Sequence, residues 1–263
     1  MAKFFTVASS SSGNCYYLGS GDTGVLIDCG LSCRFILSAL EEKGVEPKSL
    51  SGILITHEHI DHIRGLESFL RKYRLPVYAS EKVLDFLSGR DCVPAGTDLR
   101  PADENGFLAA GMMVSPFRTS HDSVGSLGFS IATADERKIT VCTDTGYLTE
   151  GALEHLPKSD LVLIESNYDR MMLLNGRYPY PLKRRIEGPQ GHLSNEDCAA
   201  ALPDLVKSGT TRIVLAHLSK ENNYPDLALQ TSVSELSLAG IVQEKDYTIF
   251  AAPRSCASET VLL

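Results

Sequence analysis

Five short apolar runs, each ending in a polar or ionisable residue, constrain the fold of this 263-residue chain more than any other feature. They cover residues 25–28, 53–57, 139–144, 161–165 and 213–217. Near-continuous runs of β-branched and aliphatic residues predict strands that are buried on both faces, so helices must cover the sheets. We expect these helices at residues 34–43, 65–71, 81–87, 195–208 and 227–236. Strands interleaved with helices indicate an α/β fold, in which ligands bind beyond the strand ends.

The length and composition fit a single globular domain, which we expect to cover residues 1–263. Hydrophobic residues make up 43% of the chain and charged residues 22%, which excludes a disordered protein. No linker divides the chain, although the halves before and after about residue 135 are similar in the alternation of their expected strands and helices, but not in sequence. Residues 91–111 are rich in Pro, Gly and acidic side chains and are expected to form a loop and hairpin.

Charge and cysteine content restrict the partners and the compartment of the protein. The 25 lysines and arginines are outnumbered by 33 aspartates and glutamates, and a formal net charge of -8 excludes a uniformly basic nucleic-acid coat. The seven cysteines form no CxxC pair, which fits reduced thiols better than a disulfide framework. Without a signal peptide or a run approaching ~18 apolar residues, we expect a cytoplasmic protein with no membrane partner.

A cluster of potential metal ligands directly follows the second apolar run. Residues 57–62 read His-Glu-His-Ile-Asp-His, which places four potential ligands in six positions although the chain has only seven histidines. Imidazole and carboxylate ligands suit Zn, Mn or Fe. His57 and His59 can reach one divalent ion from an extended loop, and Asp61 and His62 can serve a second. The alternatives are a solvated polar loop and a single zinc site built from some of these residues.

Two ions need further ligands, and the candidates His121, Asp144 and His217 each lie near the end of an apolar run. Each is a weak signal alone, because a lone loop histidine is more often an ordinary surface residue and a strand-end Asp more often caps a turn. Because all three lie near the ends of apolar runs, they are stronger candidates together than singly. Asp144 suits a bridging position, since a carboxylate binds two cations whereas a neutral imidazole does not. His155 is then left outside the site.

The order of these residues resembles the metallo-β-lactamase superfamily. That family has an HxHxDH motif after a strand, followed by an isolated His, an Asp and a final His. The resemblance implies a four-layer αββα sandwich with two divalent metal ions, Zn or Mn, at one edge. It also implies that Asp28, in Leu-Ile-Asp-Cys-Gly, orients the histidine loop without binding metal. The implied ligands are His57, His59 and His121 for one ion, Asp61, His62 and His217 for the other, and Asp144 as the bridge.

Longer blocks resemble the YycJ (WalJ) branch of that superfamily and span nearly the whole chain. They are Ser-Ser-Ser-Ser-Gly-Asn-Cys at 9–15, Glu-Ser-Asn-Tyr-Asp at 165–169, Gly-Arg-Tyr-Pro-Tyr-Pro-Leu-Lys-Arg-Arg-Ile at 176–186, Gly-His-Leu-Ser-Asn-Glu-Asp at 191–197 and His-Leu-Ser-Lys-Glu-Asn-Asn at 217–223. The branch is associated with 5′→3′ exonuclease activity on DNA and with mismatch repair. The chain departs from the branch pattern at Tyr168, where a His is expected.

A basic segment predicts a polyanionic substrate. Residues 170–186 contain five basic side chains and no acidic one, with tyrosines among them. The predicted substrate-binding residues are Arg177, Lys183, Arg184 and Arg185, together with Asn14 in the serine-rich block. Guanidinium groups bind phosphate, and aromatic rings stack on unpaired bases. The alternatives are a solvated basic loop anchored by its tyrosines and, for residues 9–14, a flexible loop.

The sequence is most consistent with a dinuclear metal-dependent phosphodiesterase that degrades nucleic acid, with DNA favoured over RNA. Asp61 and His192 are the expected catalytic residues. His192 precedes an expected helix, and the resemblance implies that it protonates the leaving oxygen; the alternative is a structural histidine at the helix entry. Other readings of the chain are an RNA-processing nuclease of the tRNA 3′-processing type, a small-molecule metallo-hydrolase, and a metal-stabilised scaffold. The sequence identifies no protein partner.

Overall fold

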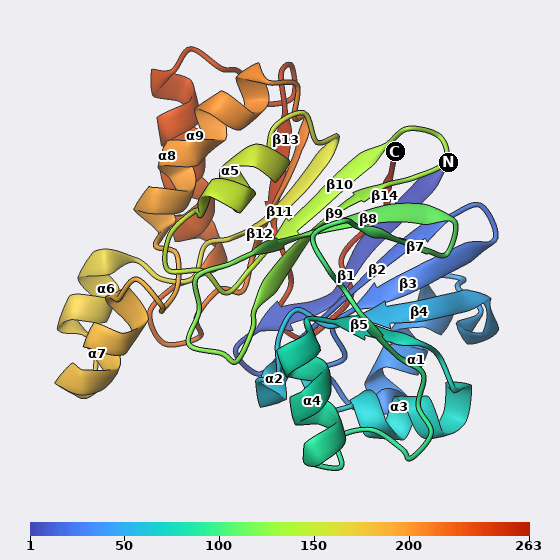
Figure 1. Ribbon diagram of the computed structural model, residues 1–263. Coiled ribbons are helices and arrows are strands. Elements are labelled where there is room, and N and C mark those ends of the chain that lie inside the picture. Colours follow the sequence, from blue (N-terminus) through green and yellow to red (C-terminus); the bar gives the residue numbers. More distant parts are fainter. The chain divides into compact units, whose positions relative to one another are not determined.

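The computed structural model describes residues 1–263, and the chain divides into two compact units (Figure 1). Unit 1 comprises Met1–Pro116, Ser123–Arg137 and Pro253–Leu263, and unit 2 comprises Phe117–Asp122 and Lys138–Ala252. The main division, after Arg137, falls close to the point where the two halves of the sequence separate. That the two units act together as one domain stays a prediction.

Unit 1 is built on a mixed seven-stranded sheet with the order β14-β1-β2-β3-β4-β5-β6. Its strands are β1 (Ala2–Ser10), β2 (Gly13–Ser20), β3 (Thr23–Ile27), β4 (Leu50–Leu54), β5 (Val77–Ala79), β6 (Leu99–Pro101) and β14 (Val261–Leu262). Strands β1 to β3 are antiparallel, as is the β1–β14 pair, whereas β3 to β6 are parallel. The unit also contains the antiparallel pair β7 (Phe107–Ala109) and β8 (Met112–Arg118), followed by β9 (Leu127–Ala132). The last two residues of β8 belong to unit 2.

Helices cover one face of this sheet. They are α1 (Cys33–Glu42), α2 (Ile60–Ile63), α3 (Leu66–Tyr73) and α4 (Glu81–Gly89), with a short 3-10 turn at Pro47–Ser49. Ile36 of α1, Phe69 of α3 and Leu87 of α4 are buried in one core cluster with sheet residues such as Leu26 and Ile53. Ser32 and Ser80 cap α1 and α4 by accepting hydrogen bonds from backbone N–H groups.

Unit 2 carries four parallel strands in the order β13-β12-β11-β10. They are β10 (Lys138–Cys142), β11 (Leu161–Glu165), β12 (Arg212–Ala216) and β13 (Thr248–Ala251). The helices are α5 (Glu150–His155), α6 (Arg170–Asn175), α7 (Tyr180–Glu187), α8 (Asn195–Lys207) and α9 (Pro225–Leu238). Helices α8 and α9 lie side by side, and their Leu202 and Leu236 share a buried cluster with the strand residues Ile164 and Ile213 (Figure 1).

The five predicted strands and five predicted helices are all present, with ends shifted by a few residues. The run at 53–57 is offset most, because β4 ends at Leu54 and the chain then leaves the sheet. The basic segment forms helices α6 and α7 instead of a loop, and the predicted loop and hairpin at 91–111 includes the parallel strand β6. The structure contains no helix with the length and hydrophobicity that a membrane crossing requires.

Candidate metal-binding and catalytic residues

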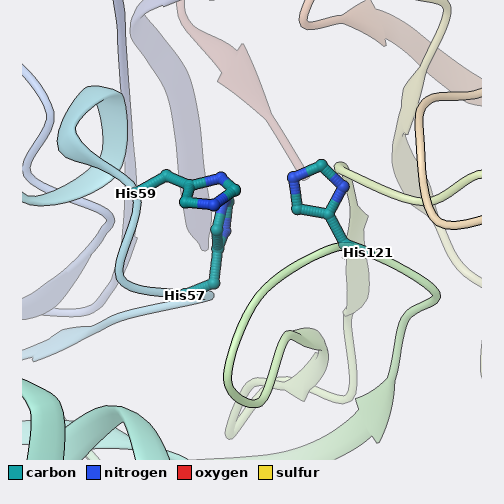
Figure 2. Close-up of side chains that lie close together, drawn as sticks. All are labelled: His57, His59 and His121. Carbon is teal, nitrogen blue, oxygen red and sulfur yellow. The ribbon is translucent and has the colours of Figure 1, made fainter. Parts of the chain in front are cut away.

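In unit 1, the predicted ligands of the HxHxDH motif lie together on the loop after β4 and on the short helix α2. The ring centroids of His57 and His59 are 4.6 Å apart, and those of His57 and His62 are 4.1 Å apart. Figure 2 shows His57 and His59 on this loop. Gly30 makes the arrangement possible, because a Cβ at that position would lie 1.6 Å from the carbonyl oxygen of Asp61. Only a residue without a side chain lets the two backbones approach this closely.

The buried carboxylate of Asp28 fixes the orientation of two of these rings. Its Oδ2 lies 2.7 Å from Nδ1 of His62 and 2.9 Å from the hydroxyl of Thr56, and the Thr56 hydroxyl lies 3.0 Å from Nδ1 of His57. Both histidines are therefore held through Nδ1, which directs Nε2 away from the carboxylate. Burial raises the pKa of Asp28, although its contacts with His62 and Thr56 oppose this shift. These contacts agree with the orienting role that the family resemblance implies for Asp28.

Asn14 lies at the start of β2 and is fully buried. Its side-chain amide nitrogen lies 3.1 Å from Nε2 of His62 and 3.4 Å from Oδ2 of Asp61, and it also donates to the carbonyl oxygen of Ser10. The structure thus places Asn14 against the predicted ligands of unit 1, while its predicted contact with substrate stays a prediction. The serine-rich block around it forms the β1–β2 hairpin and not a flexible loop.

In unit 2, the predicted ligands stand at the ends of separate strands. Asp144 follows β10 and His217 follows β12, and both adopt a left-handed backbone conformation with φ of 55°. Asp28 has the same kind of conformation at the end of β3. Such values are uncommon outside glycine, and they turn the chain sharply where each strand ends. His217 Nδ1 lies 3.1 Å from Oδ1 of Asp144.

Glu165, the last residue of β11, is fully buried and joins two histidines. Its Oε1 lies 2.8 Å from Nδ1 of His217 and 2.8 Å from Nδ1 of His192. Burial raises the pKa of Glu165, but the contacts with His192 and His217 outweigh this and hold its pKa below the ordinary value. The sequence predicts Glu165 at the end of a strand but indicates no role for it. The sequence feature that could have identified it as a site residue is its position, because the other four apolar runs also end in polar side chains.

His121 lies on the loop after β8 and completes the set of unit 2 (Figure 2). Its Nδ1 lies 2.9 Å from the carbonyl oxygen of Gly191, and its Nε2 lies 3.7 Å from Oδ1 of Asp144. Burial lowers the pKa of His121, although Asp144 opposes the shift. A lowered pKa favours the neutral imidazole, which is the form that binds metal.

His192 lies beside this set, at the entry to α8. Its ring centroid is 5.0 Å from that of His121 and 5.2 Å from that of His217. Gly191 precedes it and is buried against α7, where a Cβ would lie 2.1 Å from the carbonyl oxygen of Ile186. The glycine therefore allows the His192 loop to close onto α7, and the position of His192 is set by packing on one side and by Glu165 on the other.

The predicted substrate-binding residues of α6 and α7 differ in their contacts. Arg185 forms two bonds to the carboxylate of Asp122, at 2.5 Å and 3.0 Å, and so ties α7 to the loop that carries His121. Lys183 donates to the carbonyl oxygen of Leu174. Arg177 and Arg184 are exposed and pair with no carboxylate. None of the four contacts the histidines.

The donor sets fit divalent metal ions. In His57, His62, His121 and His217, Nδ1 meets a hydroxyl, a carboxylate or a carbonyl oxygen, so Nε2 is the atom of each ring that could bind a metal ion; in His62 this atom also lies against Asn14. Metal-binding histidines in proteins are oriented in this way by a partner on the second ring nitrogen. Imidazoles combined with Asp61 and Asp144 provide the N and O ligands that Zn and Mn accept.

Comparison with known proteins identifies the family. Residues 23–218 match the model of the beta-lactamase superfamily domain. The chain is 35% identical to exodeoxyribonuclease YycJ of Bacillus anthracis, over 94% of this chain and 91% of that protein. It is 36% identical to exodeoxyribonuclease WalJ of Streptococcus pneumoniae serotype 2 (strain D39 / NCTC 7466), over 94% and 93%.

Solved structures confirm the predicted fold class. The metallo-beta-lactamase fold protein YhfI from Bacillus subtilis superimposes with a TM-score of 0.71 at 17% identity, over 98% of each chain. Identity this low is informative about the fold alone, whereas the two relatives above match along nearly their whole length. The chain therefore belongs to the beta-lactamase superfamily and, within it, to the family of the YycJ and WalJ exodeoxyribonucleases.

Proposed function

We propose that the ligand sets of the two units form one dinuclear metal centre. In this proposal His57, His59 and His121 bind one ion, Asp61, His62 and His217 bind the other, and Asp144 bridges them. The ions are Zn or Mn. The observation that carries the proposal is the orientation of His57, His62, His121 and His217, in each of which Nδ1 meets a hydroxyl, a carboxylate or a carbonyl oxygen. Membership of the superfamily supports the same ligand set.

The activity that we propose is 5′→3′ exonucleolytic hydrolysis of DNA, with a role in mismatch repair. Its support is the similarity to relatives named exodeoxyribonucleases, which extends over 94% of the chain. When bound, the two ions would lower the pKa of a water molecule and stabilise negative charge at the phosphate. The side chains of the protein must supply the remaining requirements, which are protonation of the leaving oxygen and binding of the strand.

His192 is the proposed general acid. A sugar alkoxide is a poor leaving group, so cleavage of the P–O bond benefits from a proton donor. With Nδ1 held by Glu165 at 2.8 Å, the imidazolium keeps its transferable proton on Nε2. The negative charge of Glu165 stabilises that imidazolium, as a buried carboxylate does for a catalytic histidine in other hydrolases. His192 is partly exposed, unlike the fully buried Glu165, so a substrate can reach it.

The proposed phosphate contacts are Arg177 and Arg184, because these guanidinium groups are exposed and free of carboxylates. Lys183 adds positive charge to the same helix. Arg185, which was predicted to bind substrate, is proposed to act mainly by holding α7 against Asp122. Asn14 is proposed to reach the substrate only through the ligands Asp61 and His62 that it contacts.

Degradation of end-labelled DNA and RNA tests this function. Single-stranded and double-stranded forms of each, labelled at the 5′ or the 3′ end, are incubated with the protein in the presence and absence of Mn. We expect metal-dependent release of nucleotides from the 5′ end of DNA and slower degradation of RNA. Faster degradation of RNA than of DNA would show that RNA is the substrate. Full activity after exhaustive chelation would exclude the metal centre.

A further inference from the structure

Helices α6 and α7 pack on unit 2 through a small apolar cluster. Tyr168, Leu173 and Ile186 form a small buried cluster, against which Tyr178 and Leu182 pack. In Figure 1 the two helices lie next to each other at one end of the unit. Of the three tyrosines in and beside the basic segment, Tyr168 and Tyr178 therefore have a structural explanation, and Tyr180 does not.

The outward side of these helices exposes large apolar side chains. Tyr180, the first residue of α7, is 72% exposed, and Met171 and Leu174 of α6 are 63% and 65% exposed. Met171 and Leu174 are three residues apart and share one face of α6. Lys183 of α7 donates to the carbonyl oxygen of Leu174, which places α7 beside the C-terminal end of α6. These side chains are mostly exposed and add little to the stability of the folded chain, and exposed apolar side chains that lie together are typical of a binding surface.

The same surface carries uncompensated positive charge. Arg170 pairs with Asp197, at 2.5 Å, and Arg185 pairs with Asp122. Arg177 and Arg184 have no acidic partner, and Arg184 is four residues after Tyr180, on the same face of α7. In a chain of net charge -8, this local excess of positive charge selects for a polyanion.

We propose that this outward face of α6 and α7 binds a single strand of nucleic acid, with unpaired bases stacked on Tyr180 and phosphates on Arg177 and Arg184. The inference rests on the proposed nuclease function and specifies the form of its substrate. An exposed tyrosine ring stacks only on bases that have left the duplex, whereas arginines alone bind single and double strands alike. The bonds from Arg185 to Asp122 join this face to the loop of His121, so a strand held here leads toward the proposed ligands of unit 2.

Binding of a nuclease-resistant probe tests the proposal on the metal-loaded protein. The probe is a fluorescein-labelled oligothymidylate with phosphorothioate linkages, followed by fluorescence anisotropy, with a duplex of the same linkage as the comparison. Tyr180→Ala is expected to weaken oligothymidylate binding about tenfold, within the range reported for loss of one base stack, and to affect the duplex less. Tyr180→Phe, which keeps the ring, is expected to bind as the unaltered chain does. Tyr224→Ala is the matched control, because Tyr224 is 49% exposed at the start of α9.

Three results would overturn the proposal. They are unchanged oligothymidylate binding by Tyr180→Ala, equal weakening of the duplex, and competition by polyglutamate as strong as competition by unlabelled oligothymidylate. The last result would point to an acidic protein as the occupant. Thermal unfolding of each variant shows whether it is folded. DNA degradation by the unaltered chain is measured in parallel, so that failure of the nuclease function and failure of the single-strand surface are told apart.

Discussion

The two units orient their histidines with the same device but build it from different stretches of sequence. In unit 1, Asp28 holds His62 directly and His57 through Thr56, and both histidines come from one six-residue motif. In unit 2, Glu165 holds His192 and His217 directly, and the two histidines are 25 positions apart in the chain. In unit 1 the oriented histidines come from one short motif, whereas in unit 2 they come from segments that are distant in the sequence.

Loss of an orienting carboxylate should have different consequences in the two units. Both histidines held by Asp28 are proposed metal ligands, so its loss should act mainly on metal affinity. Glu165 holds one proposed ligand and the proposed general acid, so its loss should act on metal binding and on the chemical step together.

The largest effect is expected at Asp144, the proposed bridge between the two ligand sets. Replacing Asp144 with Ala removes the only proposed ligand shared by both ions and leaves their mutual repulsion less screened. We expect a loss of DNA hydrolysis of more than about 10³-fold, above the cost of losing one electrostatic contact. The measurement is kcat on single-stranded DNA after metal reconstitution. Asp204→Ala, an exposed substitution on α8, is the control.

Glu165→Gln keeps the size of the side chain but removes its charge. The variant loses the charge that stabilises the His192 imidazolium, and it orients His217 more weakly because a neutral amide oxygen is a poorer acceptor than a carboxylate. We expect kcat on DNA to fall by about 10²–10³-fold even at saturating metal. Recovery of full activity by added metal would show that Glu165 serves the ligand His217 alone.

His192→Ala is expected to lower DNA hydrolysis by about 10²-fold or more, within the range of general acid catalysis. Hydrolysis of bis(p-nitrophenyl) phosphate should fall much less, because its phenolate leaves without protonation. Equal losses on both substrates would remove His192 from the acid role. His155→Ala is the control, since this histidine stacks on Phe117 away from the proposed ligands.

For Asp28→Asn we expect metal affinity to fall by about 10–100-fold, as is typical when the partner of a metal-binding histidine is lost. Activity should return to within a few-fold of the unaltered chain at high metal concentration. Metal titration of the apo-protein, read by activity and by calorimetry, gives the affinity. A kcat loss as large as that of Glu165→Gln, not restored by metal, would show that the two carboxylates have the same role.

The smallest effect distinguishes the neighbouring arginines of α7. Arg184→Ala should flatten the salt dependence of single-stranded DNA binding, because each lost phosphate contact lowers the slope by about 0.7. Arg185→Ala should instead lower the thermal midpoint, because Arg185 holds Asp122. If the two variants have the same salt slope and the same stability, the pairing of Arg185 does not matter and both act on substrate.

The sequence predicted the parts of the molecule that depend on local pattern. The apolar runs located β3, β10, β11 and β12, and the HxHxDH motif located the proposed ligands of unit 1. The sequence did not predict the β1–β2 hairpin, because its serine and glycine residues favour loops and its register is set by the pairing of the two strands. Helices α6 and α7 were missed as well, since each is short and depends on the cluster around Tyr168.

The role of Glu165 could not be derived from the sequence, because its two partners follow it by 27 and 52 positions. Only the parallel order of β11 and β12 brings it to His217. His192 could be placed near the site by resemblance, but its contact with Glu165 depends on the way Gly191 packs against α7. Ligands spread over strand ends are thus predictable as candidates, and their partners become known only with the fold.

Electron paramagnetic resonance of the protein reconstituted with Mn²⁺ shows whether the proposed ligands of the two units form one dinuclear centre. Two ions sharing a carboxylate at the separation of about 3.5–4 Å usual for two-metal sites are magnetically coupled. We predict two equivalents of Mn per chain and a spin-coupled spectrum, which is lost in the Asp144→Ala variant. A spectrum of isolated Mn²⁺ ions at the same stoichiometry would show that the two ions do not share Asp144, and the dinuclear centre would be excluded.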